Sequence, residues 1–156
     1  MRLDWLELKV PPLALTVGAA IVMVVVPAAF GRTTSVRPEV AIPIGIAAAL
    51  AGLLLALRGV IDFRCAQTTV DPWHPEQSAR LVTTGVYRWT RNPMYLGFVA
   101  ALAGLAIALQ SVAGLAIASL AAVYLQRFQI HPEVRTLQRR FGDAFNVYLG
   151  QVRRWL

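Results

Sequence analysis

The sequence predicts an all-α fold: an integral membrane bundle of four transmembrane helices with a C-terminal amphipathic interfacial helix. Of the 156 residues, 57% are hydrophobic and only 15% are charged. The apolar residues form long blocks instead of alternating with polar residues, which is typical of helices in hydrocarbon rather than of a soluble core. We therefore treat residues 1–156 as a single membrane domain.

The transmembrane helices are predicted from the length of each apolar block, because one span needs roughly 20 mostly apolar residues. Residues 10–30 and 40–57 each suit a single span. The apolar run 94–125 is too long for one, since a helix rises about 1.5 Å per residue and the hydrocarbon layer is about 30 Å thick. The polar pair Gln110 and Ser111 near its middle predicts a tight hairpin. The expected spans are residues 10–30, 40–57, 93–109 and 112–130.

The basic residues predict the orientation, because they concentrate in cytoplasmic loops. Only Arg32 and Arg37 lie between the first two spans, and the hairpin turn has none. Both termini, the loop 64–92 and the C-terminal helix 132–152 are therefore expected in the cytoplasm. The arginine- and alanine-rich composition suggests a bacterial source, and hence the inner membrane. The opening segment contains acidic residues, so we interpret it as a retained span rather than a cleaved signal peptide.

The third span is predicted to begin inside the stretch YRWTRNPMYL, residues 87–96. Asn92 is a favoured N-cap residue and Pro93 a favoured first helical residue. The unpaired amides and the positive end of the helix dipole would then face the cytoplasmic interface. Such a helix end attracts an anion.

Basic and aromatic side chains gather around this helix start. Arginines bind carboxylates, and aromatic rings stack on a base or face a cation. The same residues, together with Trp73 in the preceding loop, also suit an aromatic belt and a positive-inside anchor. Composition alone favours that simpler interpretation. The residues concerned are Tyr87, Arg88, Trp89, Arg91 and Tyr95.

The last block predicts one amphipathic helix over residues 132–152. Pro132 suits a helix start, and Glu133 in the first turn suits the helix dipole. Spacing alone favours this structural role of Glu133 over a functional one. Apolar residues then recur every three or four positions, which predicts a helix lying on the membrane or across the bundle. They are Val134, Leu137, Phe141, Phe145, Tyr148 and Val152.

The sequence does not indicate a nucleic-acid-binding site, a metal site or a disulfide within the chain, and it leaves the oligomeric state open. The formal charge of +7 is explained by arginines that flank spans and contact membrane lipids, and no nucleic-acid-binding motif is present. His74 and His131 have no partner at ligand spacing, so no metal site is expected. The lone Cys65 has no disulfide partner within the chain. The repeated segment AGLAIA, at 103–108 and 113–118, offers small residues for packing inside one chain, while the oligomeric state stays open.

Two stretches resemble a family of integral membrane methyltransferases. They are GVYRWTRNPMYLGF at 85–98 and, after an apolar hairpin, PEVRTLQRRFGDAFNVYLGQVRRWL at 132–156. The family includes isoprenylcysteine carboxyl methyltransferase and the phospholipid N-methyltransferases. Its members show G-x-Y-x-x-x-R-[HN]-P-x-Y, E-E-x-x-L, F-G-x-x-Y and a closing R-W in this order. Each motif is weak alone, but the ordered set is specific and covers residues 64–156.

The resemblance implies a cofactor, an acceptor and a set of site residues. The cofactor is S-adenosylmethionine in a cytoplasmic pocket, and a lipophilic small-molecule acceptor approaches from the bilayer. The expected catalytic residues are Glu133, as a base for an amine or thiol acceptor because it is the only acid between Glu76 and Asp143, and Arg154, which borders the implied site and would orient the acceptor. The implied cofactor-binding residues are Tyr87, Arg88, Arg91, Asn92, Pro93, Tyr95, Leu96, Glu133, Leu137 and Tyr148.

The sequence departs from the family pattern at three positions. Asn92 stands where many members have His, which matters little if it caps the helix. Val134 replaces the second acid of the E-E pair and leaves Glu133 as the single carboxylate there. Phe145 replaces the Tyr of F-G-x-x-Y and loses only a hydroxyl.

The expected activity is methyl transfer to a carboxylate, amine or thiol, and the sequence does not distinguish between these acceptors. A carboxylate acceptor needs no base, whereas an amine or thiol does. Two alternatives remain. One is a non-catalytic membrane subunit or scaffold, and the other is a reductase-like relative of the sterol reductases, which usually have many more spans.

Overall fold

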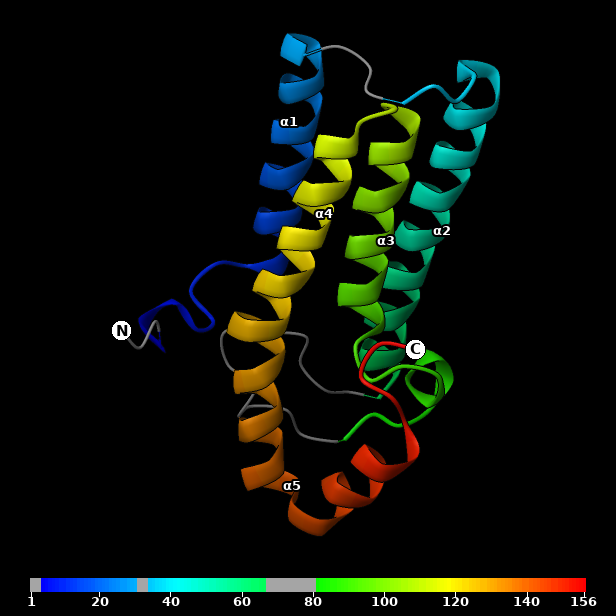
Figure 1. Ribbon diagram of the computed structural model, residues 1–156. Coiled ribbons are helices and arrows are strands. Elements are labelled where there is room, and N and C mark those ends of the chain that lie inside the picture. Colours follow the sequence, from blue (N-terminus) through cyan, green and yellow to red (C-terminus); the bar gives the residue numbers. More distant parts are fainter. Residues whose placement is uncertain (1–3, 31–33, 67–80) are drawn as a thin grey trace.

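The structure, a computed structural model, describes residues 4–30, 34–66 and 81–156 (Figure 1). These ranges are helical without any strand, which confirms the all-α fold class for this part of the chain. Trp73 and His74, considered above as an anchor and a metal ligand, lie outside the described residues. The helices are η1 (Asp4–Leu6), α1 (Pro12–Phe30), α2 (Pro38–Cys65), η3 (Gly85–Arg88), α3 (Pro93–Ala108), α4 (Val112–Leu125), the π-helix η4 (Gln126–Ile130) and α5 (His131–Gln151).

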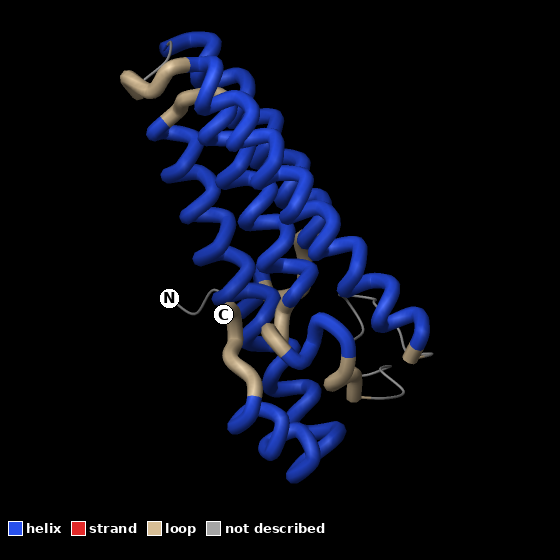
Figure 2. Tube along the Cα trace, turned by 90° about the vertical axis from the view of Figure 1, so that its right-hand side faces the viewer, coloured by secondary structure: helices blue, strands red, loops and turns tan. Residues whose placement is uncertain are grey.

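Helices α1 to α4 form a bundle in which α3 packs between α2 and α4, and α4 packs on α1 (Figure 1). The turn between α3 and α4 lies at one end of the bundle. The other end carries η3, α5 and the C-terminal segment, and the chain enters α1 from there. The second half of α5 turns back toward the bundle (Figure 2). Residues from both halves of the chain therefore meet at this end.

Two helical stretches are long and apolar enough to cross a membrane, namely Pro38–Cys65 and Val112–Gln151. The apolar helices Pro12–Val25 and Pro93–Ala108 are shorter. Large apolar side chains cover the outside of the bundle: Leu54 is 66% exposed and Leu120 is 68% exposed. Exposed apolar surface of this extent is unfavourable in water and suits contact with lipid.

Glycines allow α2 and α3 to pack with their backbones in contact. A Cβ atom on Gly52 would lie 2.6 Å from the Gly97 carbonyl oxygen and 2.6 Å from the Ala101 nitrogen. Gly45 and Gly104 meet in the same way two turns further along, where a Cβ on either would lie within 2.6 Å of the other's carbonyl oxygen. Such close approach is available only to residues without a side chain.

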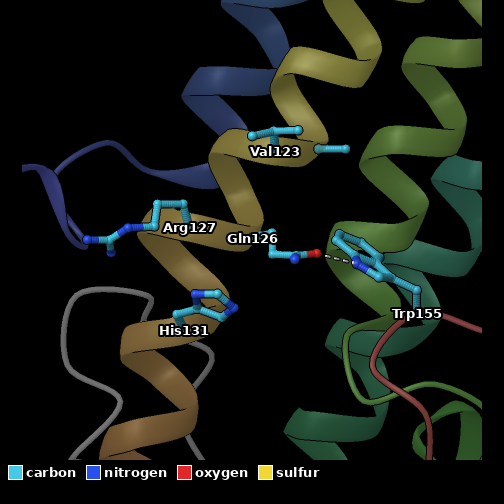
Figure 3. A pocket seen from close by; sticks show the side chains of 6 residues that line it. Val123, Gln126, Arg127, His131 and Trp155 are labelled. Atoms are coloured by element: carbon cyan, nitrogen blue, oxygen red, sulfur yellow. Dashed lines mark hydrogen bonds between the residues drawn. The ribbon is translucent and has the colours of Figure 1, made fainter. Parts of the chain in front are cut away.

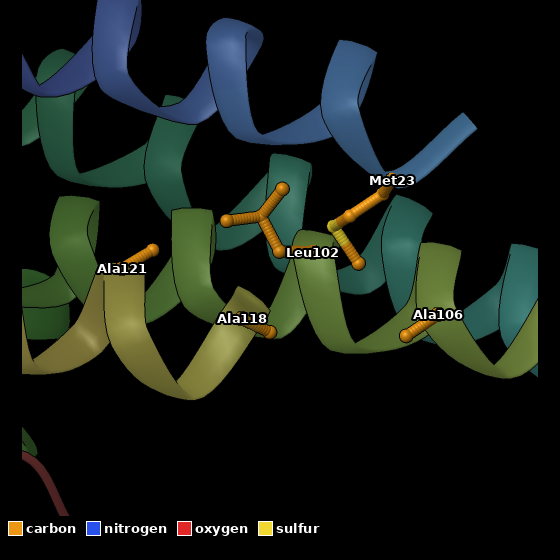
Figure 4. Packing of buried hydrophobic residues seen from close by; sticks show 5 residues of the cluster. All are labelled: Met23, Leu102, Ala106, Ala118 and Ala121. Carbon is orange, nitrogen blue, oxygen red and sulfur yellow. The ribbon is translucent and has the colours of Figure 1, made fainter. Parts of the chain in front are cut away.

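The hydrophobic core between α1, α3 and α4 is built mainly from small residues (Figure 4). Met23 of α1 and Leu102 of α3 fill the space that the small residues leave. Both are buried, at 0% and 1% exposure. The repeated AGLAIA segments contribute Ala106 and Ala118 to this core, so in this chain they pack within the bundle.

The helix that begins as α4 does not end before Pro132, where we expected a boundary between a span and a separate interfacial helix. It continues through the π-turn η4 into α5. Pro132 has no amide hydrogen, so the carbonyl of Phe128, four residues before it, lacks its usual partner. The Leu8 amide donates to that carbonyl at 3.0 Å. The N-terminal segment thus stabilises the bulge, and α5, with its exposed arginines, extends beyond the apolar part of this helix.

Two further boundaries differ from the expectation. Helix α2 continues to Cys65, beyond the expected end at residue 57, and brings Arg58 and Asp62 to the end of the bundle. The single helix expected over 132–152 is bent at Gly142, which has φ 50° and ψ −124°. That conformation is nearly restricted to glycine. The bend turns the second half of α5, with Tyr148, back toward η3.

The α2–α3 contact makes a prediction about stability. Gly52→Ala should lower the free energy of unfolding by about 1–3 kcal/mol, because the new methyl group meets backbone atoms that cannot move aside. Gly18→Ala is the matched control, since a Cβ at Gly18 meets nothing within 4 Å. Its expected effect is a gain of up to about 1 kcal/mol from helix propensity. Unfolding of both variants in detergent micelles tests this, and equal stability would contradict the close backbone packing.

Candidate functional site

The sequence-predicted residues lie at the end of the bundle where η3, the start of α3, the first turn of α5 and the C-terminal segment meet. Backbone and side-chain hydrogen bonds hold the C-terminal segment there. The Arg91 amide donates to the Arg153 carbonyl at 3.0 Å. The Asn92 side chain and the Thr90 hydroxyl donate to the Arg154 carbonyl at 2.8 and 3.3 Å. These bonds place Arg154 beside the start of α3.

Asn92 has the N-cap position of α3, but its side chain makes no capping hydrogen bond. A capping side chain must accept from an amide of the first turn. Here the side-chain amide of Asn92 instead donates to the carbonyl of Arg154. The expectation that Asn92 caps the helix is therefore wrong in its mechanism. Asn92 links the start of α3 to the C-terminal segment.

Tyr95 and Glu133 connect α3 to α5. The Tyr95 hydroxyl, which is buried, donates to Glu133 Oε1. Glu133 lies beyond the apolar part of the α4–α5 helix. Burial raises the pKa of the Glu133 carboxyl to about 7, while the hydrogen bond from Tyr95 acts in the opposite direction. Near neutral pH, Glu133 is therefore able both to accept a proton and to hold a cation.

Tyr87 and Tyr148 connect η3 to the second half of α5. The Tyr148 hydroxyl donates to the Tyr87 carbonyl at 2.7 Å in a buried position. Burial raises the pKa of Tyr148 to about 12, opposed by the positive charge of Arg91. Burial also raises the pKa of Tyr87, with smaller effects from Tyr148 and Glu133. Both phenols thus remain neutral, and Tyr87 lies within electrostatic range of the Glu133 carboxylate.

Arg91 and Arg154 lie close enough to repel each other. The pKa of Arg91 is lowered, first by burial and then by the charge of Arg154. The Nε atoms of both arginines are buried and have no hydrogen-bond partner among the described residues, and the same holds for the Tyr87 hydroxyl. Buried donors are normally paired. Two like charges with unpaired buried donors form an environment that an anion would stabilise.

The remaining predicted residues contribute less to this cluster. Pro93 is buried at the start of α3. Arg88 is exposed at the end of η3, and no side-chain hydrogen bond or ion pair within the described residues ties it to the cluster. Leu96 and Leu137 are partly buried.

A cavity of about 230 Å³ lies beside the cluster, against α4 and η4 (Figure 3). Trp155 borders the cavity on one side, where its Nε1 donates to Gln126 Oε1 at 2.9 Å. Figure 3 shows Gln126 and His131 pointing toward Trp155, while the Arg127 guanidinium points toward the N-terminal segment, where it pairs with Glu7. The residues that line the cavity are Ala122, Val123, Gln126, Arg127, His131 and Trp155.

Arg154 and Trp155 separate this cavity from the tyrosines. Arg154 Nη1 lies 3.2 Å from His131 Nε2. Arginine has no acceptor, so His131 Nε2 accepts, and the ring proton is on Nδ1. Burial and the nearby arginines, Arg154 foremost, lower the pKa of His131, which agrees with a neutral ring. Trp155 packs on the cluster that contains Tyr95.

Sequence reasoning missed Asp62 and Trp155 as parts of this region. Asp62 is 8% exposed, although it is charged. An acid within an apolar helix is a signal that was available from the sequence, because such residues are costly in a membrane. Trp155 belongs to the closing R-W motif, but nothing local predicted its bond to Gln126.

Comparison with protein families matches residues 40–144, two thirds of the chain, to phospholipid methyltransferase. The chain belongs to the phospholipid methyltransferase family. This confirms the resemblance found in the sequence, and members of the family are membrane-associated methyltransferases. Comparisons with curated proteins and with solved structures found no match. The matched residues include Tyr87, Arg91, Tyr95 and Glu133 but end before Tyr148 and Arg154.

The role of Asn92 is testable with a residue that caps helices but is too short to reach the C-terminal segment. Asn92→Ser should lower the free energy of unfolding by about 1 kcal/mol, because the bond to the Arg154 carbonyl is lost. It should also speed removal of the C-terminal residues by a carboxypeptidase. Asn146→Ser is the control, because it removes a bond of the same kind, from Gln138 Nε2 at 2.9 Å, at an exposed position away from the C-terminal segment. If Asn92→Ser behaved like Asn146→Ser in both assays, Asn92 would not hold the C-terminal segment.

Proposed function

We propose that this protein transfers a methyl group from S-adenosylmethionine to a lipophilic acceptor at the cytoplasmic face of a membrane. One observation carries the proposal. The Nε atoms of Arg91 and Arg154 and the Tyr87 hydroxyl are buried without a partner among the described residues, in a cluster that also contains the Glu133 carboxylate. This is the donor set that a zwitterionic amino-acid group requires.

The residues present fit the cofactor. Arg91 and Arg154 would hold its carboxylate, and Glu133 would hold its ammonium group. The rings of Tyr87 and Tyr148 offer faces to a sulfonium cation or an adenine. When bound, S-adenosylmethionine supplies an electrophilic methyl group. The protein's own part is to orient the two reactants, a contribution that reaches roughly 7–11 kcal/mol in favourable cases.

The acceptor would reach the site from the lipid side. The cavity bordered by Trp155 is lined on α4 by Val123, an exposed apolar residue. Arg154 contacts His131 on the cavity side and repels Arg91 on the cluster side. It would therefore orient an acceptor relative to the cofactor. Glu133 would accept the proton of an amine or thiol acceptor, and a carboxylate acceptor would need no such step.

The proposal includes four spans with both termini in the cytoplasm. The Tyr95–Glu133 end of the bundle also carries the arginines of η3, η4, α5 and the C-terminal segment, whereas Arg37 is the basic residue described at the other end. This asymmetry supports a cytoplasmic site. The shorter helix α3, with 16 residues, would span about 24 Å, which is less than the hydrocarbon thickness of about 30 Å and would require local thinning of the bilayer.

Binding of S-adenosylhomocysteine, the demethylated product, tests the site by calorimetry in detergent or nanodiscs. Arg91→Ala and Glu133→Ala should each weaken binding by roughly 10-fold to 100-fold, because each removes a charge-assisted contact. Arg153→Ala, an exposed neighbour, should leave binding unchanged and serves as the control.

A transfer assay with labelled S-adenosylmethionine and a lipid extract should show the same order of activities and identify the acceptor. Saturable binding that persists in the double variant Arg91→Ala, Glu133→Ala would refute the site. A wild-type protein that binds no cofactor would favour the scaffold alternative.

The raised pKa of Glu133 predicts a pH dependence of binding. The ammonium group of the ligand requires the carboxylate form, so binding should release a proton below and around pH 7. Affinity should rise as pH increases toward about 7, a range in which an α-amino group remains protonated. Calorimetry in buffers of different ionisation enthalpy measures the proton release. Glu133→Gln should abolish it, and an unchanged release in that variant would assign the proton to another group.

A further inference from the structure

Asp62 is a buried acid whose role neither the family match nor the proposed chemistry explains. It lies in the last turn of α2, and only 8% of it is exposed. Charged residues in membrane helices are costly and rarely occur without a function. Asp62 lies next to η3 and not inside the Tyr95–Glu133 cluster, so its contacts with η3 indicate its role.

Both oxygens of Asp62 are occupied. The Val86 amide, in η3, donates to Oδ2 at 2.9 Å. Arg58, one turn earlier on α2, forms an ion pair with Oδ1 at 3.0 Å. Each oxygen thus already has a partner within the protein, and the contact outside α2 is with the backbone of the turn that carries Tyr87.

Gly85 shows how closely the carboxylate approaches this turn. Gly85 has φ +61°, and a Cβ atom there would lie 2.0 Å from Asp62 Oδ2. No side chain fits while Asp62 is in place. The Gly of the G-x-Y stretch is thus required twice, by its backbone conformation and by the carboxylate beside it.

The turn η3 is held from two sides. On the α2 side, Asp62 binds the Val86 amide, and the ring of Phe63 lies 5.0 Å from the ring of Tyr87. On the α5 side, the Tyr148 hydroxyl binds the Tyr87 carbonyl. Between these supports, the turn carries the buried Tyr87 hydroxyl, which has no partner among the described residues.

We propose that Asp62 is a positioning residue for the cofactor site: it fixes the Gly85–Arg88 turn and thereby the places of Tyr87 and the following Arg91 in that site. This inference rests on the proposed function for its binding readout. It does not rest on that function for its structural part, because the Asp62–Val86 bond exists without any ligand.

The experiment compares Asp62→Ala, which removes the acceptor, with Asp62→Asn, which keeps one. Hydrogen exchange of the wild type and variants, without ligand, reports on the Val86 amide. We expect faster exchange there in Asp62→Ala and near wild-type exchange in Asp62→Asn. Affinity for S-adenosylhomocysteine should fall about tenfold or more in Asp62→Ala and by less than about threefold in Asp62→Asn. Arg58→Ala, which removes a largely exposed partner, is the control and should bind normally.

A coupled pair keeps the test decisive if Asp62→Ala is poorly folded. In the wild-type background, Gly85→Ala should weaken binding at least about as much as Asp62→Ala does. In the Asp62→Asn background it should do the same, because the amide fills the same space. In the Asp62→Ala background it should add only a small further loss, due to the strained backbone.

Two results overturn the inference. One is a folded Asp62→Ala variant with wild-type exchange at Val86 and wild-type affinity. The other is an Asp62→Asn variant that loses binding as fully as Asp62→Ala while both keep wild-type exchange. If the wild type itself binds no cofactor, the proposed function fails and the positioning role in binding fails with it, whereas the exchange data still decide whether Asp62 holds the turn.

Discussion

The site depends on the hydrogen bonds that hold the C-terminal segment against the start of α3. The Asn92 side chain and the Arg154 carbonyl are 62 positions apart in the chain, and their bond is one of the three that place Arg154 beside Arg91. Two guanidinium groups brought together and partly buried are unfavourable, since like charges repel and burial removes hydration. A fold retains such a conflict mainly where a ligand relieves it. The bonds that hold the C-terminal segment and the proposed anion site are therefore one feature of the structure.

The sequence predicted the parts of this arrangement that follow from local chemistry. Block lengths and the pair Gln110–Ser111 predicted a turn where the structure has one, between Ala108 and Val112, because a polar pair in an apolar run has few alternatives. The contacts of Asn92 were not predictable, because its partner is distant in the sequence. The bend at Gly142 was not predictable either: Gly142 and Gly150 lie in the same helix, yet only Gly142 has a positive φ. Long-range packing decides between two such glycines.

The π-turn shows how a distant segment shapes the site. Pro132 frees the Phe128 carbonyl, and the N-terminal segment supplies Leu8 to bind it, while Glu7 pairs with Arg127 and Arg135. The extra residue in a π-turn rotates everything after it relative to α4. The direction in which Glu133 leaves the helix therefore depends on residues outside the matched family region. Position within the motif alone does not determine how that carboxylate faces Tyr95.

Asp62 and Glu133 differ in how many of their carboxylate oxygens the protein already binds, and this difference distinguishes a structural role from a ligand-binding role. Asp62 has both oxygens bound by the protein, one to the Val86 amide and one to Arg58. Glu133 has one oxygen bound to Tyr95, and its other oxygen has no hydrogen-bond partner among the described residues. A fully paired carboxylate stabilises a single arrangement of its neighbours, whereas a half-paired one, with its pKa raised to about 7 by burial, gains from a cation or a proton. The first acid therefore fixes the turn that carries Tyr87, and the second is the group left to bind a ligand.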